Sequence, residues 1–66
     1  MTAAAAAYYA AMFLREKGHI IDDVTDNDPQ FKRDGKWSLW DDSLGYFWHL
    51  THQQVIDMAK EAGWNG

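Results

Sequence analysis

Residues 36–50 read KWSLWDDSLGYFWHL, a stretch that holds three of the four tryptophans of the chain. Two apolar runs, 37–40 and 46–50, flank the turn-forming sequence DDSLG. Aromatic runs separated by Asp, Ser and Gly are typical of two antiparallel strands joined by a short loop. The stretch therefore predicts a β-hairpin, and it raises the question of which aromatic side chains the core of this protein requires.

A further strand is predicted over residues 30–32, before this hairpin. The Asp-Gly sequence at 34–35 indicates a second turn, and a three-residue loop over 33–35 would place Phe31 opposite Trp37. A two-residue loop would send Phe31 to the other side of the sheet. We favour the longer loop because it gathers the large apolar residues on one face.

Side-chain parity divides the predicted sheet into two faces, because alternate residues of a strand point to opposite sides. A four-residue loop over 42–45 places Trp40 opposite Phe47. The predicted inner face is apolar and consists of Phe31, Trp37, Leu39, Tyr46, Trp48 and Leu50. The outer face is polar except for Trp40 and Phe47, so this pair exceeds what the inner core requires.

Helices are predicted at both ends of the chain. The first, over 2–17, begins at the capping residue Thr2, is rich in alanine and ends at Gly18. The second follows Thr51, which can form a capping box with Gln54. It would pack on the inner face through Val55, Met58 and Ala62.

The predicted fold class is therefore α+β. It has an N-terminal alanine-rich helix, a three-stranded antiparallel meander and a C-terminal helix packed on one face of the sheet. The β-branched residues in 20–24 predict a short extended segment between the first helix and the meander. We expect residues 1–66 to form one small domain, because a chain of this size buries only about 60% of its surface on folding.

Two positions are open for the first helix. On the outer face it would cover Trp40 and Phe47, and Met12 and Phe13 would complete a second small core. If both helices share the inner face, the aromatic pair is exposed beside acidic residues and can anchor a partner.

Charge and composition restrict the possible partners. The net charge is −4, with six Lys and Arg against ten Asp and Glu, so the chain lacks the basic surface that direct nucleic-acid binding requires. Four aspartates lie within seven residues that contain no base: Asp22, Asp23, Asp26 and Asp28. Their charge would attract a basic protein surface. The absence of cysteine excludes disulfides and thiolate metal sites.

We expect a non-catalytic protein, because no nucleophile with an adjacent base can be identified. The sequence favours an acidic adaptor or inhibitor that binds a basic surface of a partner protein, such as one that itself binds nucleic acid. The predicted partner-binding residues are Trp40, Phe47, Asp41, Asp42, Asp22, Asp23, Asp26 and Asp28.

Two alternatives remain open. A structural protein could assemble as a homo-oligomer, in the simplest case a homodimer, through the alanine-rich helix. A small metal-binding domain could use His49 and His52, which lie near Asp41 and Asp42 in the predicted hairpin.

No cofactor is predicted. The apolar residues 3–14 are too few to span a bilayer, which takes about 20 residues, and no basic region precedes them as in a secretory signal. We therefore expect a cytoplasmic protein without a membrane partner.

Overall fold

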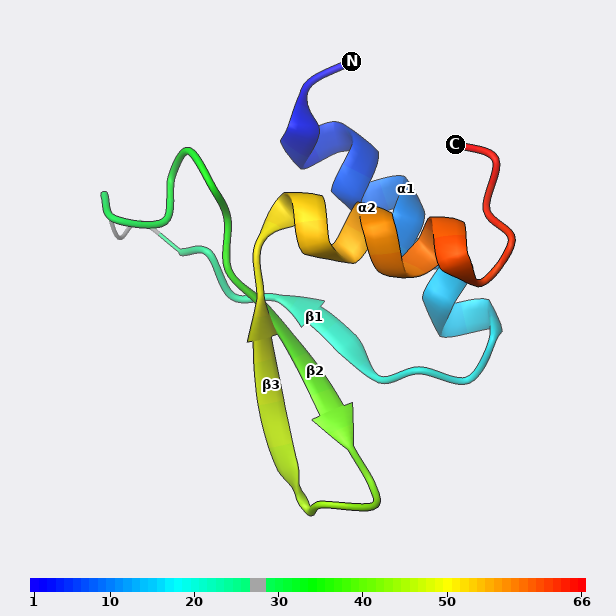
Figure 1. Ribbon diagram of the computed structural model, residues 1–66. Coiled ribbons are helices and arrows are strands. Elements are labelled where there is room, and N and C mark those ends of the chain that lie inside the picture. The colour runs from blue at the N-terminus through cyan, green and yellow to red at the C-terminus, as the bar shows by residue number, and fades with distance from the viewer. Residues whose placement is uncertain (27–28) are drawn as a thin grey trace.

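The computed structural model describes residues 1–26 and 29–66, and over these residues the chain forms two helices and one three-stranded sheet (Figure 1). The elements follow in the order α1 (Ala3–Glu16), β1 (Ile21–Asp23), β2 (Trp37–Asp41), β3 (Tyr46–Leu50) and α2 (His52–Glu61). The sheet is antiparallel throughout, with the strand order β1-β2-β3. The predicted α+β fold class is confirmed.

Helix α1 begins and ends where its capping residues predict. The Thr2 hydroxyl accepts a hydrogen bond of 3.1 Å from the Ala5 amide, which has no partner within the helix. Gly18 adopts a φ of 98° after the last turn, and the next amide, that of His19, donates back to the Leu14 carbonyl. Glycine is favoured here because a side chain would be strained at this φ.

Helix α2 begins with the predicted capping box. The Thr51 hydroxyl accepts from the Gln54 amide at 3.1 Å, and the Gln54 side chain accepts from the Thr51 amide at 2.8 Å. Because Thr51 directly follows β3, this cap turns the chain back over the end of the sheet where β3 finishes.

The β2–β3 hairpin has the predicted register. Trp40 lies opposite Phe47, and Leu39 lies opposite Trp48. The loop closes through Asp41, whose carbonyl accepts from the Gly45 amide at 2.8 Å, and Gly45 has a φ of 70°. Loop length and turn chemistry thus determine which face each side chain occupies.

The predicted first strand of the meander is wrong. Residues 30–32 lie in turns, and the other neighbour of β2 is β1, in which Asp23 pairs with Trp37. The Gly35 amide closes a turn onto the Phe31 carbonyl at 2.6 Å, so Phe31 does not reach the position opposite Trp37. Strand β1 supplies the core with a β-branched side chain, Ile21. Residues 30–32 contain no β-branched residue that could take this place.

Both helices pack on the same face of the sheet, which decides between the two positions left open for α1. The buried apolar residues come from α1, α2, β1 and β2: Ala7, Ala10, Ala11, Leu14, Ile21, Trp37, Val55, Ile56 and Ala59. The alanines of α1 allow the close approach of α2 in the same chain. In α2, Ile56 is buried, whereas Ala62, predicted to be a contact residue, is the C-cap just after the helix and is exposed.

Neither α1 nor α2 covers the outer face of the sheet (Figure 1). Within the described residues, neither helix has the length and apolar character needed to cross a bilayer.

Candidate functional site

Residues 40–48 form an aromatic hairpin that extends away from the helices (Figure 1). Three consecutive side chains in β3 are about half exposed: Tyr46 at 45%, Phe47 at 49% and Trp48 at 44%. Tyr46 and Trp48 lie on the inner face, so the prediction that they pack in the core is wrong. The helices cover the end of the sheet near Trp37 and Leu50, and the hairpin loop lies at the opposite end.

The outer face of the aromatic hairpin carries the predicted pair. The rings of Trp40 and Phe47 lie 4.9 Å apart between centroids, with their planes at 60°. Trp40 is partly buried, and its amide donates to the Ile20 carbonyl at 3.0 Å, which brings Ile20 alongside in the same row. Ile20 is exposed. The three side chains therefore form an apolar row across an uncovered sheet face, a feature typical of interaction surfaces.

The inner face of the aromatic hairpin carries a second ring pair, which parity predicts on this face but which is exposed rather than packed in the core. Tyr46 and Trp48 lie 5.3 Å apart between ring centroids, with their planes at 49°. Both residues point to the helix side of the sheet but lie beyond the helices. The cap at Thr51 starts α2 at the Leu50 end of β3, away from this ring pair.

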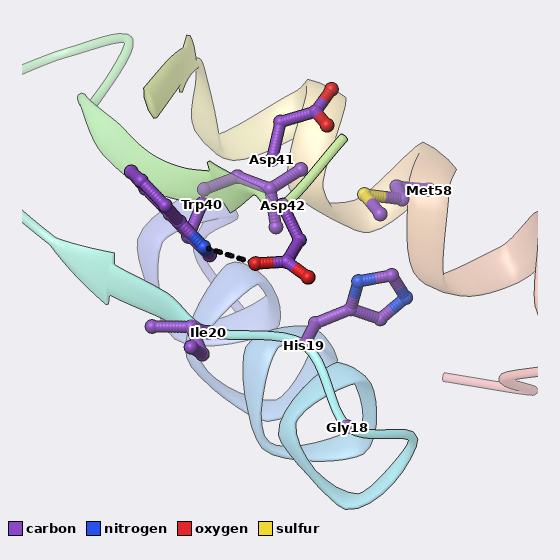
Figure 2. A pocket seen from close by; sticks show the side chains of 8 residues that line it. Gly18, His19, Ile20, Trp40, Asp41, Asp42 and Met58 are labelled. Carbon is purple, nitrogen blue, oxygen red and sulfur yellow. Dashed lines mark hydrogen bonds between the residues drawn. The ribbon is translucent and has the colours of Figure 1, made fainter. Parts of the chain in front are cut away.

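Two consecutive carboxylates bind the indoles of the two pairs. The Trp48 indole donates to Asp41 at 2.8 Å. The Trp40 indole donates to Asp42 at 3.2 Å (Figure 2). The hydrogen bond from Trp48, followed by that from the Leu44 amide, holds the pKa of Asp41 below its usual value. Each face of the aromatic hairpin thus combines a ring pair with a carboxylate.

An open groove of about 600 Å³ adjoins Trp40 and Asp42. It lies between the end of β2 and the α1–β1 connection, which includes His19, and Met58 of α2 forms another wall (Figure 2). Trp40, Asp41 and Asp42 contribute to the lining, and the Asp42 carboxylate lies beside the Trp40 indole (Figure 2). The groove can therefore accommodate a long side chain that carries a positive charge.

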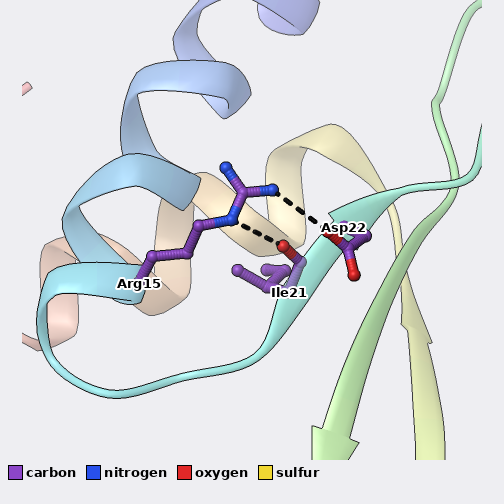
Figure 3. A network of polar contacts seen from close by, with 3 residues as sticks. All are labelled: Arg15, Ile21 and Asp22. Atoms are coloured by element: carbon purple, nitrogen blue, oxygen red, sulfur yellow. Dashed lines mark hydrogen bonds and ion pairs between the residues drawn. The ribbon is translucent and has the colours of Figure 1, made fainter.

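The aspartates of the predicted acidic loop do not join the carboxylates of the aromatic hairpin. Asp22 lies in β1 and forms an ion pair with Arg15 at 3.5 Å, while the Arg15 Nε donates to the Ile21 carbonyl at 2.8 Å (Figure 3). Asp23 accepts from the Thr25 amide at 2.9 Å.

Asp26 is exposed, with a φ of 56°. Asp23 ends β1 at the end of the sheet opposite the hairpin loop, and Asp26 follows three residues later. Asp28 lies outside the described residues. Of the predicted site, the structure brings together Trp40, Phe47, Asp41 and Asp42.

The histidine pair does not form a metal centre. His52 is buried, and its Nδ1 accepts a hydrogen bond of 2.9 Å from the Trp37 indole. His49 is exposed on the outer face, opposite Ser38. Across residues 1–26 and 29–66, no group of three or more His, Asp or Glu is placed to hold a metal ion.

In comparisons with known proteins, the sequence matches no protein-family model and no curated protein, and the fold matches no solved structure. A functional proposal therefore rests on the geometry of the aromatic hairpin.

Proposed function

We propose that this protein is a non-catalytic interaction protein that binds a basic surface of a partner protein through its aromatic hairpin, acting as an adaptor or inhibitor. One observation carries the proposal. Each face of the aromatic hairpin places a ring pair with at least one half-exposed ring beside a carboxylate that accepts a hydrogen bond from an indole of that pair.

This combination suits arginine and lysine side chains. A guanidinium or ammonium group is attracted to the face of an aromatic ring, and the attraction is strongest for tryptophan. The same cation can reach a carboxylate at the ring edge, and arginine can do so through two parallel hydrogen bonds. The Trp40–Asp42 and Trp48–Asp41 arrangements would each receive one basic side chain.

The carboxylates of the aromatic hairpin are available for such a partner. Within the described part of the chain, ion pairs join Arg15 with Asp22 and Arg33 with Asp34. Asp41 and Asp42 instead accept from neutral indole and amide groups, so no cation of residues 1–26 and 29–66 forms an ion pair with them. Their field would steer a basic surface toward the rings, and the rings would supply the desolvated contact.

A titration followed by nuclear magnetic resonance tests the proposal, with a short oligo-arginine peptide as the probe and an oligo-glutamate peptide as the control. The indole N–H signals of Trp40 and Trp48 should shift on addition of oligo-arginine, while that of buried Trp37 should not. Added salt should weaken the binding because the contact is exposed and ionic.

Matched double variants identify the carboxylates that matter. Asp41→Asn with Asp42→Asn should weaken oligo-arginine binding by roughly fivefold or more. Asp23→Asn with Asp26→Asn removes the same charge far from the rings and should have a smaller effect. Equal losses in the two variants, or a titration that leaves Trp40 and Trp48 unshifted, would contradict the proposal.

A further inference from the structure

Helix α1 exposes an apolar face on the side away from the core. Tyr8 is 54% exposed, Tyr9 51% and Met12 43%, and the Tyr8 and Tyr9 rings meet edge-on at 5.5 Å. With 3.6 residues per turn, these side chains share one face with Ala5 and Glu16. That outward face of α1 lies opposite the buried residues Ala7, Ala10, Ala11 and Leu14.

The outward face of α1 is complementary to itself. If two copies of α1 pack antiparallel about a point between Tyr8 and Tyr9, each Tyr8 lies beside Tyr9 of the other copy. Ala5 then lies opposite Met12 of the other copy, so a small side chain faces a long, flexible one. Such pairing of each position with its mirror position is what a two-fold interface requires.

Charge favours the same antiparallel arrangement. Glu16 lies on the outward face in the last turn of α1, and it belongs to neither ion pair found in the described residues. It would lie beside the first turn of the other α1, which has no acidic residue and carries the positive end of the helix dipole. The neighbouring cations point elsewhere: Arg15 binds Ile21 and Asp22, and Lys17 lies over the Phe13 ring.

We propose that two copies of this chain form a symmetric antiparallel dimer through the outward face of α1. This inference does not rest on the proposed binding function, because the aromatic hairpin belongs to different elements. It also differs from assembly through the alanine face of α1, which is used inside the chain to pack α2.

The expected dimer is weak. Helix α1 has 14 residues and so is about 21 Å long, and one helix pair of this length buries less than the roughly 800 Å² per partner of a standard interface. The dimer should therefore dissociate on dilution, and the mass in solution should be followed from micromolar to millimolar concentration.

Sedimentation equilibrium on complementary variants tests the arrangement. Ala5→Lys alone and Met12→Glu alone should each weaken self-association by about tenfold, because a charge is buried against an apolar side chain. An equimolar mixture of the two should recover the dimer. In the mixed dimer the introduced lysine of one copy faces the introduced glutamate of the other, while the second Ala5–Met12 contact stays native.

Controls keep the test decisive. Far-UV circular dichroism of each variant establishes that α1 is retained, and Tyr46→Lys on the aromatic hairpin should leave self-association unchanged. Recovery in the mixture supports the antiparallel two-fold pairing. A wild-type chain that stays monomeric at millimolar concentration, or folded variants that do not recover in the mixture, overturns it.

Discussion

The Trp37 indole donates a hydrogen bond of 2.9 Å to Nδ1 of His52 inside the core, and so joins β2 to the first residue of α2. Their rings lie 6.2 Å apart between centroids, with their planes at 73°. An Nδ1 that accepts is unprotonated, so the proton of the neutral ring is on Nε2. His52 is thus a structural core residue that positions the start of α2 on the sheet.

Removing one partner of this hydrogen bond should cost more stability than half of what the removal of both partners costs, because a single variant leaves the other partner buried and unpaired. Trp37→Phe leaves a buried His52 nitrogen without a donor, and we expect a loss of about 1–3 kcal/mol in the free energy of unfolding. His52→Leu leaves the indole without an acceptor, with a similar penalty. The double variant should lose less than the sum of the two, as measured by urea unfolding. Strictly additive losses would mean that the hydrogen bond does not couple the residues.

The backbone of Gly35 also packs against His52. Its φ is 80°, and a Cβ at this position would collide with the imidazole ring. Gly45, with a φ of 70°, has nothing within 4 Å of such a Cβ. Both Gly→Ala variants should lose roughly 1–2 kcal/mol of stability because alanine is strained at a positive φ, and Gly35→Ala should lose more because its Cβ also meets the ring. Equal urea midpoints for the two variants would show that the ring yields without cost.

The ring contact explains why the prediction of a strand at 30–32 is wrong. An Asp-Gly sequence before an aromatic strand is a strong local hairpin signal, and the sequence around Gly35 was interpreted in that way. In the structure, Gly35 serves a non-local purpose, since it lets the chain pass against His52, seventeen positions later. No local pattern reports that contact, so the choice of β1 as the neighbour of β2 depends on tertiary packing.

The β2–β3 register and both helix caps were predictable because each depends on a few neighbouring residues. Thr2, Thr51 and the loop ending at Gly45 are local signals, and parity then places Trp40 beside Phe47. Parity says which face a side chain occupies, but it does not say how far the helices extend over that face. The exposure of Tyr46 and Trp48 was missed for this reason.

Asp41 should make the stability of the aromatic hairpin depend on pH. Hydrogen bonds from Trp48 and Leu44 hold its folded-state pKa below the ordinary 3.8. A lowered folded-state pKa means that the contribution is fully present above the unfolded-state value and is lost as the pH falls through the folded-state value.

Urea midpoints measured from about pH 5 downward should therefore fall more steeply for the wild-type chain than for Asp41→Asn. The asparagine keeps a carbonyl oxygen that can accept from the Trp48 indole but does not titrate in this range. The other carboxylates are common to both proteins, so the difference reports Asp41. Parallel curves over the whole range would contradict the assignment.

The most direct test of the central claim, that the aromatic hairpin is surface rather than core, compares the urea unfolding of Phe47→Ala with that of Trp37→Ala. Trp37 is 2% exposed, and its loss should cost about 3–5 kcal/mol. Phe47 is half exposed and contacts Trp40, so its loss should cost about 1 kcal/mol, the value of one ring pair. A cost for Phe47→Ala as large as that for Trp37→Ala would place the pair in a core and leave the proposed interaction surface without its anchor.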